Sequence, residues 1–342
     1  MSIKLDSLND IARAMVAKGR GILAADESAP TCKKRFDSIN LESTEKNRNT
    51  YRDLLFTTDG MEQFISGVIL FDETIRQSTI KDNVPFPKYL SDLGVIPGIK
   101  VDAGAKHLSG SKDEKITEGL DGLGDRLKEY YELGARFAKW RAVISISEDL
   151  PSDQCIKSNA HALARYASLC QTNNIVPIVE PEILMDGHHT IRDSFITSEK
   201  VLAMVFDELR LQNVLLEGIV LKPNMVLSGY NCDEQASIEE VAQLTVEVFK
   251  RTVPVSVPGI AFLSGGQSDE LATAHLNEMN KSFGSSCPWN LTYSYGRALQ
   301  APALKAWGGD DKNIDLAQKA FYKRASLNSL ASKGEYNQGM EG

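Results

Sequence analysis

The chain has 342 residues, a hydrophobic share of 42%, a charged share of 25% and a formal net charge of -8 at pH 7. These values are typical of a folded globular protein, and the acidic balance argues against a nucleic-acid or anionic-membrane partner. The five cysteines are widely spaced and form no CxxC pair, so neither a disulfide framework nor a zinc site is indicated. Because no secretory signal and no membrane-spanning apolar run is found, we expect a cytoplasmic protein.

Eight short runs of apolar or small residues recur along the chain, each separated from the next by enough residues for a helix and two loops. They are GILAADE (21–27), ISGVILF (65–71), IPGIKVD (96–102), ARFAKWR (135–141), IVPIVEPE (175–182), LEGIVLKP (216–223), GIAFLSGG (259–266) and LTYSYGR (291–297). A strand followed by a helix, repeated eight times, predicts parallel strands. Since no glycine-rich dinucleotide turn is present, the pattern favours a closed (β/α)8 barrel, the TIM barrel, over an open doubly wound sheet.

Helical patterns lie between these runs, at 51–64, 116–134, 156–174, 197–213, 237–253 and 268–280. Ser268 in SDEL and Thr197 in TSEK are typical of helix starts. No composition shift marks a linker, so residues 1–330 are expected to form one domain. Residues 331–342 are polar, glycine-bearing and aperiodic, which predicts a flexible C-terminal tail.

Charged residues gather where the predicted strands end, which is where such barrels form their active sites. These residues are Asp26, Lys100, Asp102, Lys139, Arg141, Glu180, Glu182 and Lys222. A single charge of this kind is as readily a salt bridge or a solvated rim residue. Five charged ends together favour a functional site, because a packed barrel interior has little room for unpaired charges.

Lys222 ends the sixth run and is followed by Pro223, which cannot donate to a sheet ladder and so ends the strand. Burial disfavours an ammonium ion, and a desolvated amine becomes a nucleophile toward carbonyl carbons. The sequence therefore makes Lys222 a candidate nucleophile. A surface lysine at a strand end is the alternative interpretation.

Serine, glycine and arginine follow the last two runs, in the order Ser264-Gly265-Gly266 and Ser294-Tyr295-Gly296-Arg297. Backbone N–H groups at glycines, serine hydroxyls and a guanidinium suit a phosphate, and the loops after strands seven and eight are the usual phosphate site of such barrels. Tight turns with incidental serine and glycine are the alternative.

A second cationic group follows the first run, at Lys33, Lys34 and Arg35, with Arg48 further along. By itself this group would be a solvated helix face. Together with the first anion site, it suits a substrate with a phosphate at each end. No metal site is predicted, because only His188 and His189 lie close together and neighbours rarely bind a metal without a third ligand.

With these residues assembled, the sequence closely resembles the class I fructose-bisphosphate aldolases over nearly its whole length. The resemblance is carried by GILAADES, GIKVD, AKWR, IVPIVEPEIL, LKPNMV, FLSGGQS and SYGRALQAPALKAW, in the order of the family. It implies reversible cleavage of fructose 1,6-bisphosphate to dihydroxyacetone phosphate and glyceraldehyde 3-phosphate through a lysine imine, in glycolysis and gluconeogenesis. It also implies a phosphorylated sugar as partner, no cofactor, and a homotetramer.

The same resemblance implies roles for individual residues. Lys222 matches the Schiff-base lysine, Glu180 the general acid and base for carbinolamine dehydration, and Asp26 and Lys139 the other groups around the reacting carbons. The residues that match the cradle for the phosphate on the dihydroxyacetone side are Ser264, Gly265, Gly266, Ser294, Gly296 and Arg297. The other phosphate is expected near Ser28, Thr31, Arg35, Arg48 and Lys100, and Arg141 and Glu182 are expected in the same site, Glu182 as a partner for the local charges.

The sequence departs from the family pattern in two places. The family often ends in a tyrosine that assists proton transfer, whereas this chain ends in Gly342, and no such role is assigned to Tyr336. Ala29-Pro30 stands where Thr-Gly is expected, which leaves the contacts of that loop open. Another imine-forming aldolase or a transaldolase on the same barrel, or a binding protein that kept the barrel, remain alternatives.

Overall fold

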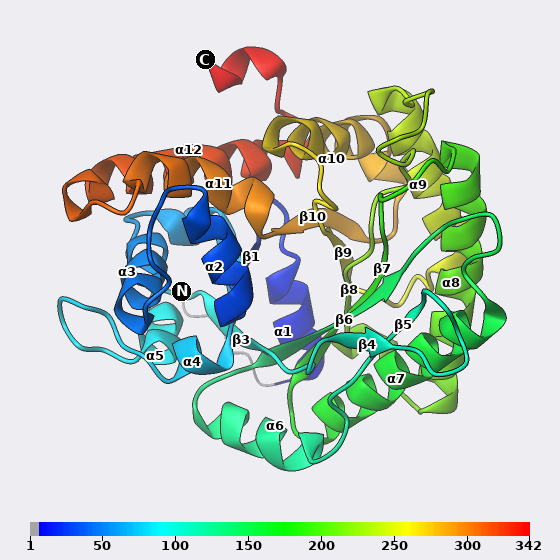
Figure 1. The fold of residues 1–342 in the computed structure, drawn as a ribbon, viewed down its shortest axis with the longest axis horizontal. Helices are drawn as coiled ribbons and strands as arrows, with labels where there is room; N and C mark the ends of the chain where they lie inside the picture. The colour runs from blue at the N-terminus through cyan, green and yellow to red at the C-terminus, as the bar shows by residue number, and fades with distance from the viewer. Residues whose placement is uncertain (1–6) are drawn as a thin grey trace.

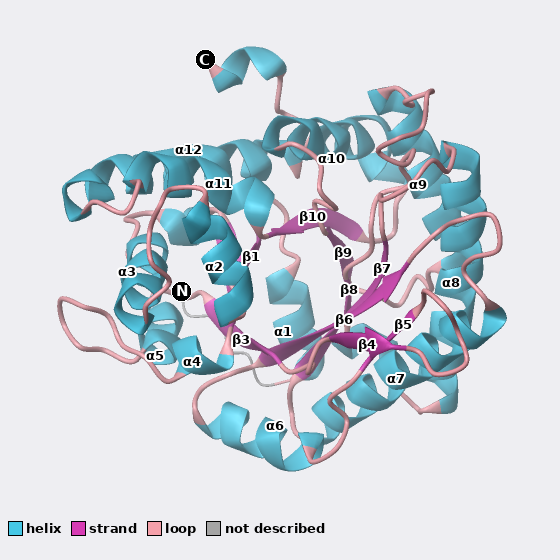
Figure 2. Ribbon diagram, viewed as in Figure 1, coloured by secondary structure: helices cyan, strands magenta, loops and turns pink. Residues whose placement is uncertain are grey.

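The computed structural model describes residues 7–342 as one closed barrel of eight parallel strands surrounded by helices (Figures 1 and 2). The strands follow one another around the barrel in chain order, and the first pairs with the last. They are β1 (Gly21–Ala24), β2 (Ile65–Leu70), β3 (Ile96–Lys100), β6 (Phe137–Ile144), β7 (Val176–Ile183), β8 (Val220–Leu221), β9 (Gly259–Phe262) and β10 (Asn290–Tyr295). Each predicted run overlaps one of these strands, so the predicted TIM barrel is confirmed.

The helices cover the outside of the barrel, except for α1, which lies in the middle of the ring in Figure 1. They are α1 (Leu8–Met15), α2 (Ala29–Asp37), α3 (Glu45–Phe56), α4 (Asp72–Ile75), α5 (Phe86–Asp92), α6 (Leu123–Glu132), α7 (Asp153–Thr172), α8 (Ile191–Leu211), α9 (Ile238–Thr252), α10 (Asp269–Phe283), α11 (Arg297–Trp307) and α12 (Ile314–Ala331). Outside the barrel, β4 (Ala105–His107) and β5 (Lys115–Thr117) form an antiparallel pair.

Three details of the predicted elements were wrong. The helix expected at 116–134 begins only at Leu123, because its first residues form β5 and two glycines that follow, Gly119 and Gly122, take positive φ angles of 125° and 64°. The helix expected to start at Thr197 begins at Ile191, where Thr190 and Asp193 form a capping box. The start at Ser268 is confirmed, since its side chain accepts a hydrogen bond from the Leu271 N–H.

The third detail is the sixth strand, which the sequence predicts over 216–223 and which is only two residues long. The preceding residues Leu216–Gly218 form a short 3-10 helix, η2. The Gln171 side chain donates to the Leu215 carbonyl at 2.8 Å and accepts from the Leu215 N–H at 2.9 Å, so a side chain takes the place of a strand partner there. The strand therefore begins late and ends directly before Lys222.

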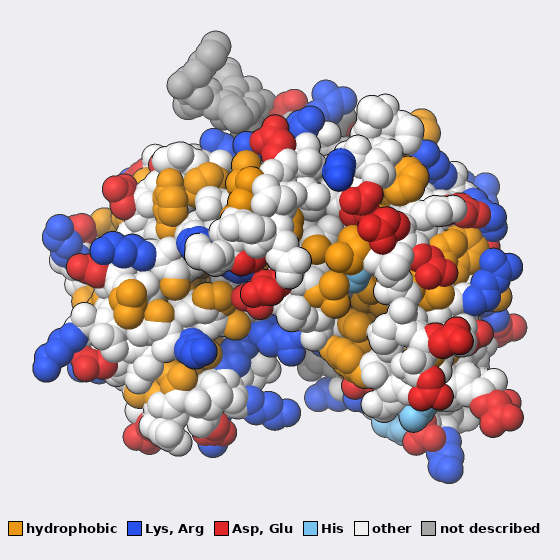
Figure 3. All heavy atoms as spheres, turned by 90° about the horizontal axis from the view of Figure 1, so that it is seen from above, with side chains coloured by type: hydrophobic (Ala, Val, Ile, Leu, Met, Phe, Trp, Pro, Cys, Tyr) orange, Lys and Arg blue, Asp and Glu red, His pale blue; other side chains and the backbone are white. Residues whose placement is uncertain are grey.

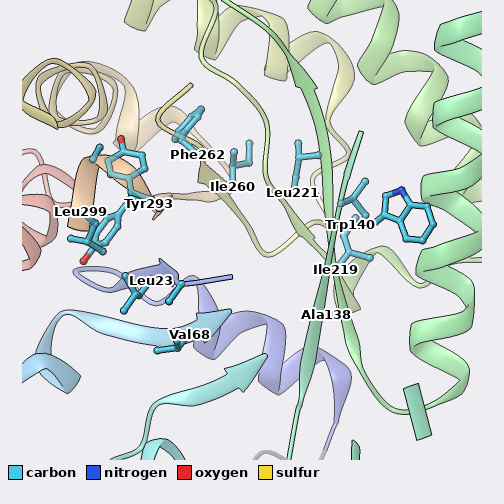
Figure 4. Packing of buried hydrophobic residues seen from close by; sticks show 14 of the residues in the cluster. Leu23, Val68, Ala138, Trp140, Ile219, Leu221, Ile260, Phe262, Tyr293 and Leu299 are labelled. Atoms are coloured by element: carbon cyan, nitrogen blue, oxygen red, sulfur yellow. The ribbon is translucent and has the colours of Figure 1, made fainter. Parts of the chain in front are cut away.

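The apolar core forms two separate layers, one inside the barrel and one between the strands and the outer helices. Figure 4 shows part of the outer layer, where Leu23, Leu221 and Phe262 lie on the outer face of their strands. The inner layer contains the strand residues Ile22, Ala24, Ile69, Ile96, Phe137, Val176, Ile178, Val220 and Ala261, and α1 adds Ile11, Ala12 and Met15. Helix α1 therefore closes the N-terminal end of the barrel with apolar side chains.

The C-terminal residues lie against α10 and α12. Tyr336 is buried, its N–H donates to Asn277 Oδ1 at 2.9 Å, and its hydroxyl donates to Glu341 Oε1 at 2.8 Å. Arg324 on α12 pairs with Glu341 at 2.8 Å. Burial, followed by the hydrogen bond to Glu341, raises the pKa of Tyr336 to about 12. The flexibility predicted for residues 331–342 stays a prediction, and these contacts are what motion of the segment would have to break.

The charged side chains on the face drawn in Figure 3 alternate in sign, with Lys and Arg interspersed among Asp and Glu. None of the helices described between residues 7 and 342 combines the length and the apolar character that crossing a bilayer requires.

Candidate active site

A cavity of about 390 Å³ opens at the C-terminal ends of the barrel strands. Strand geometry explains its charged walls, because side chains two residues apart point to the same side of a strand. Ala24, Phe137, Ile178 and Val220 belong to the inner apolar layer, and the residues two positions further on line the cavity. These next inward residues are Asp26, Lys139, Glu180 and Lys222. The barrel interior thus changes from apolar to charged over two residues along four strands and their C-terminal ends.

These four side chains form one continuous chain of ionic contacts. Lys139 Nζ lies 2.8 Å from Asp26 Oδ2 and 3.6 Å from Glu180 Oε2. Lys222 Nζ lies 3.2 Å from Glu180 Oε1. Lys139, Glu180 and Lys222 are each at most 4% exposed, so water screens these charges little. Two ammonium groups and two carboxylates balance in charge, which is how the barrel tolerates four ionisable groups in so small a space.

The protonation states of Asp26 and Lys139 follow from their contacts. Burial would raise the pKa of Asp26, but the ammonium groups of Lys139 and Lys222 outweigh burial and hold that pKa well below its ordinary value. Burial would lower the pKa of Lys139, but Asp26 and Glu180 outweigh it and raise that pKa. At neutral pH Asp26 is therefore a carboxylate that can accept a proton. Lys139 is an ammonium held by two carboxylates.

Lys222 is positioned by backbone contacts on both sides. Its N–H donates to the Val179 carbonyl of β7 at 2.8 Å, which extends the pairing of β7 and β8 by one residue. Pro223 then accepts a hydrogen bond from the Leu263 N–H at 3.1 Å. The side chain is 4% exposed, so the alternative of a surface lysine is excluded.

Two further ion pairs line the same cavity. Arg141 pairs with Glu182, and Lys100 Nζ lies 2.5 Å from Asp102 Oδ1. Burial would lower the pKa of Arg141, but Glu182 outweighs it and raises that pKa. The expectation that Glu182 steadies a local charge agrees with this contact. Arg141 keeps 43% of its side chain exposed and can reach an anion in the cavity.

The loops after β9 and β10 contribute uncharged groups to the cavity. Its wall includes Ser264, Gly265, Gly266, Ser294 and Gly296. Gly265 and Gly266 have φ angles of 56° and 85°, which side chains rarely adopt, and a Cβ at Gly266 would lie 1.6 Å from the Tyr230 hydroxyl. The Ser294 hydroxyl is buried and has no hydrogen-bond partner within residues 7–342. The loops therefore offer N–H and O–H donors to an anion.

Only some of the residues predicted to bind the other phosphate line the cavity. Ser28, Thr31, Arg35 and Lys100 line the cavity. Ser28 caps α2, and Ala29-Pro30 begins that helix, where proline is tolerated because the first N–H groups have no helical partner. Ala29-Pro30, which stands where Thr-Gly was expected, thus forms the first turn of α2.

Two predicted residues, Arg48 and Arg297, do not line the cavity. Arg48 of α3 forms a bidentate ion pair with Glu73, in which its Nε and Nη2 groups donate to the two carboxylate oxygens at 2.7 Å and 2.6 Å. Arg297 begins α11, donates to the Gln267 carbonyl at 3.0 Å, and lines a neighbouring pocket together with Arg35. Their binding roles stay predictions.

Glu27 and its partner Arg52 were not predicted. Glu27 lines the cavity and contacts two guanidinium groups at 2.5 Å, those of Arg35 and Arg52. Burial would raise the pKa of Glu27, but Arg52 and then Arg35 outweigh it and lower that pKa. Arg52 is 2% exposed on α3. No local pattern in the sequence predicts this pair, because Glu27 lies in the loop after β1 and Arg52 lies 25 positions further on, in α3.

Within residues 7–342 no three His, Cys, Asp or Glu side chains gather in a way that could hold a metal ion. The chemistry that the cavity offers is that of a buried amine beside carboxylates, next to loops that suit an anion. A closed parallel barrel with such a site at the C-terminal ends of its strands defines a TIM-barrel enzyme.

Comparisons with known proteins identify the family. The family model for fructose-bisphosphate aldolase class-I matches residues 7–342, and the chain belongs to this family of lyases. A probable fructose-bisphosphate aldolase class 1 from Xanthomonas campestris pv. campestris is 56% identical over 335 residues, which cover 98% of this chain and 99% of that protein. Fructose-bisphosphate aldolase 4, cytosolic, from Arabidopsis thaliana is 54% identical over 318 residues, covering 93% and 80%.

A solved structure agrees with both matches. It is a ternary complex of fructose-bisphosphate aldolase from Plasmodium falciparum with TRAP and a small-molecule inhibitor. The two chains are 51% identical and superpose with a TM-score of 0.95, over 97% of this chain and 95% of that one. The resemblance read from the sequence is therefore confirmed at the level of family and fold.

Proposed function

We propose that this chain cleaves fructose 1,6-bisphosphate reversibly to dihydroxyacetone phosphate and glyceraldehyde 3-phosphate through an imine on Lys222. One observation carries the assignment of the lysine. Of the two buried lysines in the cavity, Lys139 lies between two carboxylates, whereas Lys222 touches only Glu180, at 3.2 Å. Membership of the class-I fructose-bisphosphate aldolase family supports the substrate.

The contacts of Lys222 suit the formation of the imine. Its amine attacks the ketone carbon of the substrate, and the product is a carbinolamine. Glu180 lies within reach of that new bond and can deliver the proton with which the hydroxyl leaves as water. The iminium that remains is an electron sink beside the carbon-carbon bond to be cleaved.

Asp26 is placed to complete the cleavage. As a carboxylate it accepts the proton of the hydroxyl on the carbon that becomes the aldehyde, while the electrons of the broken bond enter the iminium and form an enamine. Lys139 lies 2.8 Å from Asp26, where it keeps that group ionised and offers a positive charge beside the reacting oxygen. Protonation of the enamine and hydrolysis of the imine release the second product.

The two phosphates are assigned to two sectors of the cavity wall. The loops after β9 and β10, with Ser264, Gly265, Gly266, Ser294 and Gly296, suit the phosphate on the dihydroxyacetone side. Ser28, Thr31, Arg35, Lys100 and Arg141 suit the other phosphate. Both sectors belong to one cavity, which supports a substrate with a phosphate at each end.

Reductive trapping tests the proposal directly. Borohydride added in the presence of dihydroxyacetone phosphate should attach the ligand to the peptide that contains Lys222, and Lys222→Met should abolish the label. The exposed Lys88, which pairs with Asp92 at 2.6 Å, provides a control through Lys88→Met, which should label fully. Absence of label in an active wild-type preparation would sink the proposal.

We further propose that the protein is a cytoplasmic homotetramer. The relative from Arabidopsis thaliana that is named cytosolic supports the location. Large apolar side chains on α8, Ile196 and Leu211, are 52% and 66% exposed, and a second copy of the chain would remove them from water. Light scattering of the purified protein and fractionation of the source cells test the two statements separately.

A further inference from the structure

The loop that offers Ser264, Gly265 and Gly266 to the cavity is held from behind by a buried side chain. Gln267 is 3% exposed and directly follows the two glycines. Its Nε2 group donates to the Ser264 carbonyl at 2.9 Å, and its N–H donates to the same carbonyl at 3.1 Å. One residue thus fixes both ends of a loop whose glycines have little conformational restraint of their own.

Gln267 also reaches the two neighbouring loops of the barrel mouth. Its carbonyl accepts a hydrogen bond from Arg297 Nη2 at 3.0 Å, at the first residue of α11. Its Nε2 group lies 3.6 Å from the sulfur of Met225, three residues after Lys222. The loops after β8, β9 and β10 therefore meet at one residue, Gln267, through its backbone carbonyl and its buried side-chain amide.

That amide is also in contact with His275 of α10. His275 is 3% exposed, and its Nδ1 lies 2.6 Å from Gln267 Oε1. Because the amide oxygen can only accept, Nδ1 carries the proton and donates it. Burial lowers the pKa of His275 to about 4, so the ring is neutral near pH 7 and keeps this single donor.

Donors and acceptors match along the whole chain of contacts. His275 donates to the oxygen of the Gln267 amide, and the nitrogen of the same amide donates to Ser264. A reversed amide would set its oxygen against the Ser264 carbonyl oxygen, and that contact would repel. The Ser264 carbonyl therefore fixes which way the amide points, and the N–H of His275 stabilises that rotamer of Gln267.

We infer that Gln267, supported by His275, is a positioning residue that holds the Ser264–Gly266 loop in the geometry required to bind a substrate phosphate. This inference rests on the proposed function, which assigns that loop to the phosphate on the dihydroxyacetone side. Neither side chain lines the cavity. Both act through the loop, so their loss affects binding of the phosphate before it affects the imine chemistry.

The experiment compares His275→Phe with a matched loss elsewhere on the same helix. Thr273 is fully buried on α10, and its hydroxyl donates to Asn328 Oδ1 at 2.8 Å, away from the loop. Thr273→Val removes the buried contacts of this hydroxyl, which include a hydrogen bond accepted from Arg324 Nη2 at 2.9 Å, without touching Gln267. The dissociation constant of inorganic phosphate, KM and kcat for fructose 1-phosphate, and Tm are measured for both variants and the wild type.

Loss of one buried hydrogen bond should weaken phosphate binding and raise KM by about 5- to 30-fold in His275→Phe, with kcat changed by less than about threefold. Thr273→Val should lower Tm by a similar amount and leave phosphate binding and KM as in the wild type. Gln267→Met removes both side-chain bonds and should show the larger loss of binding, which keeps the test decisive if His275→Phe folds poorly.

Two outcomes would overturn the inference. If His275→Phe or Gln267→Met binds phosphate with the dissociation constant of the wild type, the Gln267 amide does not fix the geometry of the loop. An equal loss of binding in Thr273→Val shows that the effect is a general weakening of α10. Failure of the proposed function would be seen differently, because borohydride would then leave no imine label on the wild type. Phosphate titration of the variants would still measure whether Gln267 and His275 affect binding at the loop.

Discussion

The two sides of the cavity differ in the kind of groups that line them. On the side of β1, β6, β7 and β8, four ionisable side chains lie on the strands or just past their C-terminal ends and compensate each other at distances between 2.8 and 3.6 Å. On the side of β9 and β10, the wall includes glycines and serines at the end of β10 and in the loops that follow, and the side chains that fix the loop after β9 lie behind it. We propose that the first side holds the reacting groups and that the second binds an anion.

The two sides also differ in what fixes the positions of their groups. Strand positions fix the charged side chains directly, because barrel pairing sets the direction of each Cβ. A loop has no such pairing to fix its backbone, so the geometry of the anion side depends on buried side chains such as Gln267. Substitutions on the charged side are therefore expected to reduce kcat, and substitutions on the loop side to raise KM.

The largest effect is expected for Lys222→Met, which removes the proposed nucleophile while keeping a side chain of similar length. Turnover of fructose 1,6-bisphosphate should fall by about 10⁴-fold or more, because Lys139 and Lys100, the other lysines of the cavity wall, are held as ammonium groups by carboxylates. Steady-state rates measure the loss. Lys100→Met, at a lysine that lines the same cavity, is the control and should raise KM while retaining the imine label. Activity above about one hundredth of the wild type would contradict the assignment.

Asp26→Asn should give the next largest loss, because the amide cannot accept the proton that cleavage releases. We expect kcat to fall by about 10²- to 10⁴-fold. Labelling of Lys222 by borohydride should persist, since imine formation precedes this step. Glu73→Gln, which removes the partner of Arg48 outside the cavity, is the matched control and should change kcat by less than about threefold. Equal losses in both variants would refute the role of Asp26.

Glu27→Gln tests the buried ion pairs behind the charged side through stability. Arg52 would lose its carboxylate partner in a fully buried position, which costs about 3 kcal/mol of unfolding free energy at pH 7. The pKa of Glu27 is lowered from its ordinary value of 4.5, so its stabilising effect is present above that pH and is lost as the pH falls through the folded-state pKa.

Denaturant unfolding of the wild type and Glu27→Gln between pH 7 and pH 3 provides the measurement. The difference in unfolding free energy should be fully present near pH 7 and should shrink as the pH falls below about 4.5 toward the lowered folded-state pKa, because the protonated wild-type carboxyl resembles the amide. Asp37→Asn, at an exposed carboxylate paired with Lys33, is the control and should show little difference at any pH. A constant difference across the range would show that the charge of Glu27 is not the cause.

Gly266→Ala should have the smallest effect of the four, and it should act on binding. The new Cβ would lie 1.6 Å from the Tyr230 hydroxyl, and φ is 85°, so the loop must shift. We expect KM to rise about tenfold with kcat nearly unchanged. Gly110→Ala has a φ of 83° and only the Gln154 amide within 4 Å of the new Cβ, so it carries the same backbone strain without the clash. An unchanged KM in Gly266→Ala would show that the loop geometry does not matter for binding.

Much of this architecture could be predicted from local patterns. Eight apolar runs gave eight strands, and the charges at their ends came together because parallel strands in a barrel end on one side. The lengths of elements were less certain. The strand before Lys222 is two residues long because the Gln171 side chain binds the Leu215 backbone, a contact between residues 44 positions apart that no local pattern contains.

The sequence by itself determined the barrel, the family and the set of ionisable groups at its mouth, because each depends on residue types at short, regular spacing. Tertiary structure alone decided which charges neutralise each other, for example that Lys139 pairs with Asp26 and Glu180 while Arg48 is held by Glu73 outside the cavity. It also decided that Gln267 and His275 lie behind the anion loop. The physical reason is that pairing and packing depend on distances between residues far apart in the chain, which only the closed barrel fixes.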